Sequence, residues 1–394
     1  MKAPRVVLVS RRFWPSSDDD AALATRMATS FVDRGWPTTV ITQTGQAHWP
    51  ASYDHNGVRV ERLLRPARGW LSVWNQRHAV LRWFEQQRAT FDVVVPLGLN
   101  DDAALVIEAS KRLRFPVVSR VLQVGPGGEC HQQMHTSAGM RLRRACAKSD
   151  VVVAASELAE RELIAAGYPR DRIRLITPGI TLPEPRRADA RSAIRAALST
   201  ADPGLNLPEN AWLALHSLHA ARPESTMWLL QVWRTVVAHH PRAWLWLLGS
   251  AEQQLWARRQ LQELNLLGRV MPIGAFDDVQ DFFLAADAFI EPGPTYEPPL
   301  FMLQAMAAEL PVIAVAGNEG VPESGLPVID GRSGRRIPPQ NVEALLAAIE
   351  QIEQRPAWSH ELGCAGRQIV EQRFRVEAEM EAYARLFDKL RAAR

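Results

Sequence analysis

The sequence predicts two doubly wound α/β domains followed by a helical C-terminal tail. Short, apolar, β-branched runs alternate with segments of helical spacing, a pattern typical of parallel strands that helices cover on both faces. This rhythm stops at a proline-rich stretch and restarts beyond it, as expected at a domain boundary. The chain has 394 residues, which exceeds the roughly 250–300 residues that one hydrophobic core supports.

In the first half, apolar strands and helical segments follow one another in order. A helical pattern over Asp20–Arg34 ends at Gly35, a residue type that commonly terminates helices. Asn56-Gly57 marks a turn before the third strand. The expected strands are Val6–Val9, Thr38–Thr42, Val58–Leu63, Val93–Val95, Val117–Val121 and Val151–Ala154.

The second half begins after Thr177-Pro178-Gly179 and a run of further prolines, and we place a linker at 181–208. The expected strands are Trp212–His216, Ala243–Leu248, Val270–Ile273, Ala288–Ile290 and Val312–Val315. The expected helices are Thr226–His239, Gln253–Leu264, Leu300–Ala308, Val342–Glu353, Leu362–Arg373 and Glu377–Leu390. The predicted domains are therefore 1–180 and 209–374, with a tail at 375–394.

Composition excludes several classes of protein. A hydrophobic content of 47% with 23% charged residues is not that of a disordered or fibrous chain. No apolar run approaches the roughly 20 residues of a membrane-spanning helix, and the first apolar stretch is too short for a signal peptide. Cys130, Cys146 and Cys364 form no CxxC pair and no metal-ligand spacing, so we interpret them as reduced thiols in a cytoplasmic protein.

Charge is distributed unevenly along the chain. Residues 1–180 hold 25 Lys and Arg against 17 Asp and Glu, whereas the remainder holds 21 against 26. This asymmetry indicates either two domains with different partners or an uneven solvated surface. Nucleic acid is not an expected partner, because no Lys- or Arg-rich run contains interleaved aromatic residues.

The region from Ala286 to Leu345 carries the most specific pattern. Ala286-Asp287-Ala288-Phe289-Ile290 precedes Tyr296-Glu297, and Ala305–Ala314 leads to Gly317–Glu323. In this order the segments resemble those of the group-1 retaining glycosyltransferases of the GT-B fold. The resemblance implies two Rossmann-like domains facing a cleft, with an acceptor at 1–180 and a nucleotide-sugar donor at 209–374. It also implies that the tail at 375–394 returns to the first domain.

A nucleotide-diphosphate sugar needs positive charge and helix N-termini beside its phosphates. The family places an Arg and a Lys after the first strand of the second domain, but here His219 and Glu224 occupy those places and Arg222 lies between them. The family's E-x7-E pair becomes Glu297 and Gln304, one residue closer. Pro298 and Pro299 replace a glycine loop and remove two potential N–H donors.

From these correspondences we assign Glu297 and His219 as candidate catalytic residues. If helical geometry extends back to Glu297, that side chain and Gln304 project from one helix face. The candidate donor-binding residues are Arg222, Gln304, Leu300, Ser217 and Gly293.

The first domain also departs from the family pattern. An acidic loop, Pro15–Asp20, replaces the family's glycines after the first strand, and its Asp-x-Asp pattern is interpreted as a helix cap rather than a metal site. A glycine-rich loop, Gly125–His131, suits either close substrate approach or a plain connection. The candidate acceptor-side residues are Ser17, Asp19, Gln123 and His131, and no metal ligand or cofactor is assigned.

Two functions follow. The first is a glycosyltransferase that moves a sugar from a nucleotide-diphosphate sugar to an acceptor, with retention and without metal. The alternative is a non-catalytic GT-B protein that binds a nucleotide, sugar or partner after loss of donor-site residues. The acceptor class is lipid-linked or polysaccharide, and the Arg- and Trp-rich segment 62–84 indicates either a peripheral membrane contact or a surface helix with its aromatics in the core.

Overall fold

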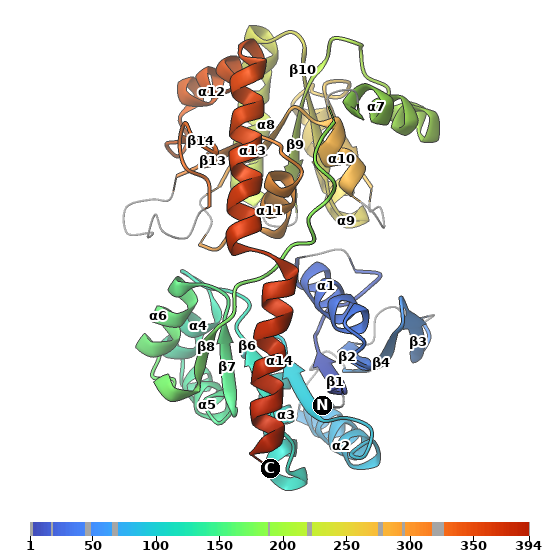
Figure 1. Ribbon diagram of the computed structural model, residues 1–394, viewed down its shortest axis with the longest axis vertical. Coiled ribbons are helices and arrows are strands. Elements are labelled where there is room, and N and C mark those ends of the chain that lie inside the picture. Colours follow the sequence, from blue (N-terminus) through green and yellow to red (C-terminus); the bar gives the residue numbers. More distant parts are fainter. Residues whose placement is uncertain are drawn as a thin grey trace. The chain divides into compact units, whose positions relative to one another are not determined.

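The structure is a computed structural model that describes residues 3–16, 19–43, 49–64, 70–187, 190–218, 223–274, 279–293, 296–316 and 327–393 (Figure 1). Contacts divide the chain into two units. Unit 1 comprises Met1–Pro178 and Val376–Arg394, and unit 2 comprises Gly179–Arg375. Each unit is a doubly wound α/β domain, which confirms the predicted fold class.

Unit 1 contains one predominantly parallel sheet. Its strands have the order β3-β4-β2-β1-β5, and parallel bridges Val94–Val117 and Leu97–Arg120 connect β5 to the group β6-β7-β8. Only β3, paired with β4, is antiparallel among the described pairs. The strands are β1 Val6–Val9, β2 Thr38–Gln43, β3 Ser52–His55, β4 Val58–Leu64, β5 Val93–Pro96, β6 Val118–Arg120, β7 Val151–Ala154 and β8 Ile173–Leu175.

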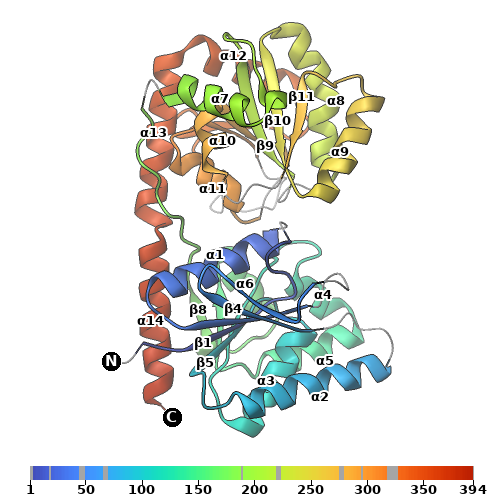
Figure 2. The same cartoon turned by 90° about the vertical axis from the view of Figure 1, so that its right-hand side faces the viewer.

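Helices cover both faces of this sheet. One core lies under α1 and α14, and a second lies under α2, α3, α5 and α6 (Figure 2). The strand residues alternate between these cores, because successive side chains of a strand point to opposite faces. The helices are α1 Asp19–Asp33, α2 Trp70–Gln86, α3 Asp101–Leu113, α4 Glu129–His135, α5 Ser137–Cys146, α6 Glu157–Ala165 and α14 Val376–Ala392.

The last helix, α14, packs within unit 1 through apolar and charged contacts. Its Tyr383 and Phe387 are 0% exposed in the core that includes Phe31 of α1. The buried carboxylate of Glu379 accepts hydrogen bonds from Arg26 of α1, at 2.7 Å for the shorter one. Arg120 of β6 lies 3.6 Å from the same carboxylate and donates to the Tyr383 hydroxyl at 3.1 Å. These contacts join the chain's end to its first helix.

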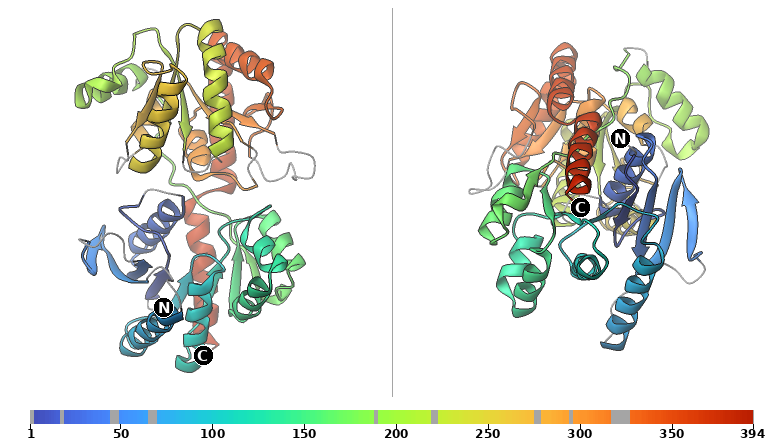
Figure 3. Two further views of the ribbon diagram at one scale, coloured as in Figure 1. Left: turned by 180° about the vertical axis from the view of Figure 1, so that it is seen from behind. Right: turned by 60° about the horizontal axis from the view of Figure 1, so that its bottom comes forward.

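Unit 2 contains a six-stranded parallel sheet of order β11-β10-β9-β12-β13-β14. Helices α7, α10, α11 and α13 pack on one face, and α8, α9 and α12 pack on the other (Figure 3). The strands are β9 Trp212–Ser217, β10 Ala243–Leu248, β11 Val270–Ile273, β12 Ala288–Glu291, β13 Val312–Val315 and β14 Gly334–Ile337. The helices are α7 Ala190–Ala201, α8 Pro223–His239, α9 Ala251–Glu263, α10 Gln280–Ala285, α11 Leu300–Ala307, α12 Val342–Gln354 and α13 Pro356–Arg373.

The segment 181–208 differs from the expected linker. It contains α7, whose Leu198 belongs to the unit 2 core together with Ile180 and Leu205. Arg195 of α7 donates to the carbonyl oxygen of Ala285 at 2.8 Å, which fixes the helix on α10. The prolines therefore bound an integral helix of unit 2, and composition alone did not distinguish it from a connection.

Arg62 and Phe84 of the segment 62–84 are buried in unit 1 and are not exposed for a membrane contact. Arg62 is 7% exposed and its guanidinium lies over the ring of Tyr53, at 4.3 Å from the centroid. Phe84 is 0% exposed and stacks on Phe115 at 5.0 Å. Arg65 and Arg68 and the side chains of Trp70 and Trp74 lie outside the described part. Among the helices that the structure describes, none has the length and apolar content needed to cross a bilayer.

Candidate functional site

The strand order of unit 2 reverses between β9 and β12. From β9 the chain proceeds to β10 and β11 on one side, and from β12 to β13 and β14 on the other. In doubly wound sheets, ligands bind outside the carboxyl ends of the strands at such a switch point. Helices α8, α9 and α11 begin at this edge, so the positive ends of their dipoles favour an anion there.

A buried histidine, His216, connects the elements at the switch point through hydrogen bonds. His216, near the end of β9, is 0% exposed. Its Nδ1 lies 2.9 Å from the carbonyl oxygen of Ile290 in β12, and its Nε2 lies 3.1 Å from the hydroxyl of Thr226 in α8. Burial lowers the pKa of His216 to about 4, so the ring is neutral at physiological pH. His216 therefore connects two strands and a helix, and it is not available to a ligand.

Ser217 and Glu291 end the two strands that flank the switch point. Phe289 lies opposite Leu215, so Glu291 and Ser217, two residues further along each strand, face the same side of the sheet. Both are buried, with 1% and 0% exposure respectively. The sequence predicted a role for Ser217 but not for Glu291. The signal was an acidic residue closing an otherwise apolar strand, Ala288–Glu291.

The loop after β12 lies directly against the first turn of α8. A Cβ atom on Gly293 would lie 2.5 Å from the hydroxyl oxygen and 2.9 Å from the Cβ of Ser225. Only glycine fits this close approach without a shift of the backbone. Gly293 thus holds the β12 loop beside the N-terminus of α8, at the edge where an anion is favoured.

Helix α11 starts three residues after Glu297, whereas a helix face shared by Glu297 and Gln304 requires helical backbone from Glu297 onwards. Pro299 has an extended conformation, with φ −59° and ψ 144°, and the helix begins at Leu300. Glu297 therefore lies in the preceding bend, so the condition under which it would share a helix face with Gln304 is not met. Glu297 and Pro298 each precede a proline, and helical backbone is disfavoured for a residue before proline, so the helix starts only after Pro299.

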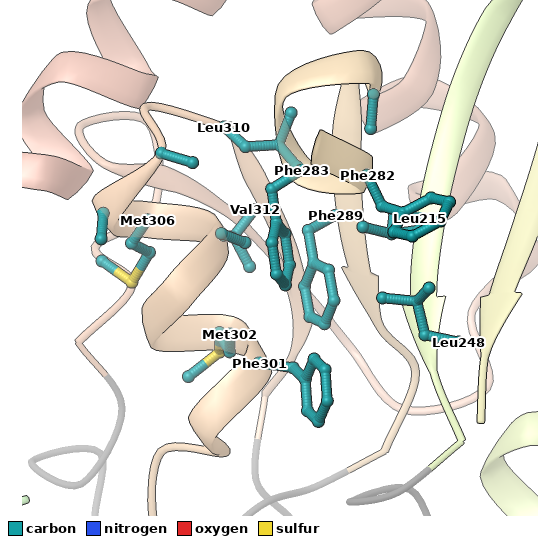
Figure 4. Packing of buried hydrophobic residues seen from close by; sticks show 14 of the residues in the cluster. Leu215, Leu248, Phe282, Phe283, Phe289, Phe301, Met302, Met306, Leu310 and Val312 are labelled. Atoms are coloured by element: carbon teal, nitrogen blue, oxygen red, sulfur yellow. The ribbon is translucent and has the colours of Figure 1, made fainter. Parts of the chain in front are cut away.

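Gln304 is one turn into α11, on a helix that is otherwise almost wholly apolar. Figure 4 shows Phe301 of this helix beside the rings of Phe283 and Phe289, and its ring centroid lies 6.2 Å from that of Phe283. Gln304 is partly exposed, and its Oε1 is buried without a hydrogen-bond partner among the described residues. A buried acceptor of this kind costs roughly 1–3 kcal/mol if it stays unsatisfied, which makes Gln304 a candidate acceptor for a hydroxyl group.

Of the remaining donor-side candidates, the structure describes Leu300 but not His219 or Arg222. Leu300 is partly buried at the first position of α11, on the same edge as Ser217 and Gly293. His219 and Arg222 lie outside the described residues, so their candidate roles stay predictions.

In unit 1 the strand order reverses between β1 and β5, and the acceptor-side candidates lie around the carboxyl ends of its strands. Asp19 begins α1, consistent with an acidic helix start, and Ser17 lies outside the described part. Gln123 is exposed, and its carbonyl oxygen accepts from the Glu129 amide at 3.0 Å. His131 is exposed and stacks on His135, with ring centroids 4.0 Å apart.

Glu129, the first residue of α4, is a further candidate that sequence reasoning passed over. Its Oε2 accepts a hydrogen bond from the Leu122 amide at 3.2 Å, which ties α4 to the loop after β6. Burial raises the pKa of Glu129 to about 8, although amide hydrogen bonds from Leu99 and Leu122 act against the rise. A carboxyl group that titrates near neutral pH at a strand-end loop is a candidate proton donor or acceptor.

Comparison with known proteins gives family matches in both units. The family model described as "Glycosyl transferase 4-like domain" matches residues 21–179, and the model "Glycosyl transferases group 1" matches residues 212–355. The lipopolysaccharide core biosynthesis glycosyltransferase LpsE of Rhizobium meliloti (strain 1021) is 30% identical over 151 residues, which are 38% of this chain and 43% of that protein. The chain thus spans less than half the length of this curated relative.

Solved structures match over nearly the whole chain. Sucrose-phosphate synthase from Thermosynechococcus elongatus has a TM-score of 0.72 at 21% identity and covers 99% of this chain and 100% of its own. HepE of Anabaena, in complex with UDP-glucose, has a TM-score of 0.73 at 15% identity and covers 98% of this chain and 100% of its own. At these identities the structures establish the fold. With a family model matched in each unit, the chain belongs to the group-1 glycosyltransferases of the GT-B fold.

Proposed function

We propose that this protein is a glycosyltransferase that moves a sugar from a nucleotide-diphosphate sugar to an acceptor, with retention of configuration and without a metal at the donor site. The observation that carries the proposal is the edge of unit 2 at the β9–β12 switch point. There the N-termini of α8 and α11 meet the strand ends at Ser217 and Glu291, and Gln304 offers an unsatisfied acceptor one turn into α11.

The donor's parts are assigned by their chemistry. The diphosphate takes the N-terminus of α8, close to Gly293, because backbone amides and the helix dipole attract phosphate there. The ribose hydroxyls take Gln304, which replaces a charged hydrogen bond of the family by a neutral one. Glu297 faces the sugar, and His219 and Arg222 complete the phosphate contacts. The structural match to HepE, whose structure contains UDP-glucose, supports this class of donor.

On the acceptor side, Ser17, Asp19, Gln123 and His131 lie on segments that follow the strands of unit 1. We add Glu129 as the group that exchanges a proton with the acceptor. The acceptor class is lipid-linked or polysaccharide, with the exposed part of α2 as the membrane-facing surface in the lipid-linked case.

The first test is a titration panel of UDP, GDP, ADP and TDP with their sugars, combined with donor hydrolysis and the Gln304→Ala variant. We expect one nucleotide to bind, and Gln304→Ala to weaken it by about 0.5–1.5 kcal/mol, the contribution of a neutral hydrogen bond. Gln354→Ala, which changes an exposed glutamine of α12, is the matched control and leaves the affinity unchanged. Equal affinities for wild type and Gln304→Ala would place the ribose elsewhere.

The alternative is a non-catalytic binding protein. The observation in its favour is the start of α11, where Pro299 occupies the N-cap without a side-chain hydrogen bond to the first turn. Because proline has no N–H, this end of α11 offers fewer donors to a phosphate than a glycine loop does. Nucleotide binding without hydrolysis or transfer in the same panel would establish the alternative, whereas slow donor hydrolysis would exclude it.

A further inference from the structure

Three side chains with metal-ligating atoms meet at the opposite edge of the unit 2 sheet, where the strands begin. Glu309 lies in the turn between α11 and β13, and His360 and Cys364 are four residues apart on α13. One ligand atom from each residue lies within 4.8 Å of the other two. The Sγ of Cys364 is 3.5 Å from the Nε2 of His360.

We propose that Glu309, His360 and Cys364 form a Zn²⁺ site with an open fourth position. Thiolate, imidazole and carboxylate are the ligands zinc takes in proteins, whereas Mg²⁺ and Ca²⁺ prefer oxygen alone. With bonds of about 2.0–2.3 Å, the ligand atoms of a tetrahedral zinc lie roughly 3–4 Å apart. The Cys364–His360 separation already meets this requirement, and Glu309 needs only a small side-chain adjustment.

The backbone holds Glu309 against α13. Glu309 has a left-handed conformation, with φ 57°, and is 7% exposed. The neighbouring helix comes so close that a Cβ on Gly363 would lie 2.0 Å from the Glu309 carbonyl oxygen. Since Gly363 directly precedes Cys364, this contact fixes the carboxylate beside the thiol and the imidazole of the same helix.

The hydrogen bonds around Glu309 leave one carboxylate oxygen for a metal. Its Oε2 accepts from the Arg186 amide at 3.3 Å. Its Oε1 forms an ion pair with Arg367, whose Nε lies 3.7 Å away, too far for a hydrogen bond. Arg367 instead donates to Glu371 at 2.9 Å and to the carbonyl oxygens of Ala307 and Pro183, each at 2.8 Å. A metal at Oε1 therefore displaces no hydrogen bond of Arg367.

A cavity borders two of the three proposed ligands. It has a volume of about 620 Å³, and both Glu309 and His360 line it. His360 is exposed, so its ring can turn towards the thiol from the solvent side. A site with three protein ligands and one open position binds water or a further ligand there.

The test is metal titration of the full chain after removal of bound metal, with Zn²⁺ followed by thermal unfolding and Co²⁺ followed by absorption. We expect one Zn²⁺ per chain, a rise in unfolding temperature, and a sulfur-to-cobalt charge-transfer band that reports the Cys364 thiolate. Cys364→Ser and His360→Ala each remove a metal ligand, so each should weaken binding by at least the roughly tenfold that the loss of a ligand's hydrogen-bond partner costs. Cys364→Ser should also abolish the band. His239→Ala, which removes an exposed histidine of α8, should change neither.

Two outcomes would overturn the site. If wild type binds no Zn²⁺ at micromolar concentration, the contact between Cys364 and His360 is a thiol–imidazole hydrogen bond only. If wild type and both variants bind alike, the metal lies elsewhere. His360→Ala alters an exposed side chain, and circular dichroism will show whether it retains the fold. Nucleotide binding is measured separately, so a failure of this site leaves the proposed transferase function unaffected.

Discussion

Gly363 shows how one absent side chain can determine the packing of a whole helix. A Cβ there would meet the carbonyl oxygen of Glu309 at 2.0 Å and its carbonyl carbon at 2.7 Å, and neither backbone atom can swing aside. We expect Gly363→Ala to lower the free energy of unfolding of unit 2 by about 1–3 kcal/mol, the range for overpacking. Urea unfolding followed by tryptophan fluorescence measures this.

The matched control is Gly366→Ala on the same helix. A Cβ at Gly366 would lie 3.5 Å from the nearest atom, which is ordinary van der Waals contact. Because alanine favours helix over glycine by about 1 kcal/mol, Gly366→Ala should be neutral or stabilising. If both substitutions lower the free energy of unfolding equally, the close approach of Gly363 to Glu309 is not what makes glycine necessary on this helix.

Glu129 makes stability depend on pH. Its pKa rises from 4.5 to about 8 on folding, so the native state binds more protons than the unfolded state between these values. The free energy of unfolding therefore falls as pH rises through this window, by at most about 1.4 kcal/mol per pH unit. Glu129→Gln should remove this part of the slope.

The measurement is urea unfolding of wild type and Glu129→Gln between about pH 5 and about pH 8. His216 acts in the opposite sense, because its lowered pKa removes stability only as pH falls below 6.5 towards about 4. Because both proteins contain His216, the difference between the pH dependence of wild type and that of Glu129→Gln reports Glu129 alone. Parallel curves for the two proteins would mean that the Glu129 carboxyl is ionised in the native state.

At the scale of elements, α14 is part of the core of unit 1. Phe387 is 0% exposed, and its ring lies 5.6 Å from that of Trp36 and 5.5 Å from that of Tyr383. We expect Phe387→Ala to cost about 3–5 kcal/mol, the usual loss for a buried phenylalanine. Arg385→Ala on the exposed face of α14 should change stability by no more than about 0.5 kcal/mol. Similar melting temperatures for both variants would contradict this packing.

At the scale of the whole molecule, the two units differ in continuity. Unit 2 is one uninterrupted segment, Gly179–Arg375, with cores on both faces of its sheet. Unit 1 needs Val376–Arg394 from the other end of the chain. We expect a fragment 179–375 to fold alone, and a fragment 1–178 to fold only when a peptide 376–394 is added. Circular dichroism and limited proteolysis measure both, and a stably folded 1–178 would show that α14 is dispensable.

Much of the fold was predictable from local patterns. Runs such as Val151–Ala154 and Ala243–Leu248 were assigned with the bounds the structure has, because a strand buried on both faces is apolar at every position. Helices with a clear stripe, such as α1 and α12, were found to within about a turn. The amphipathic α7 was missed because prolines on both sides of it resembled a linker.

The sequence by itself determined the fold class and the order of most of the strands and helices, because these depend on periodicity along the chain. The motifs between Ala286 and Leu345 carried the resemblance to the family. Only the tertiary structure decided which side chains meet. It set Glu291 and Ser217 on the same side of the sheet and brought Glu309 close to His360 and Cys364, residues that are far apart in sequence. It also separated Glu297 from the helix of Gln304. The physical reason is that such contacts depend on strand register, helix starts and close backbone approach, and spacing along the chain does not specify these.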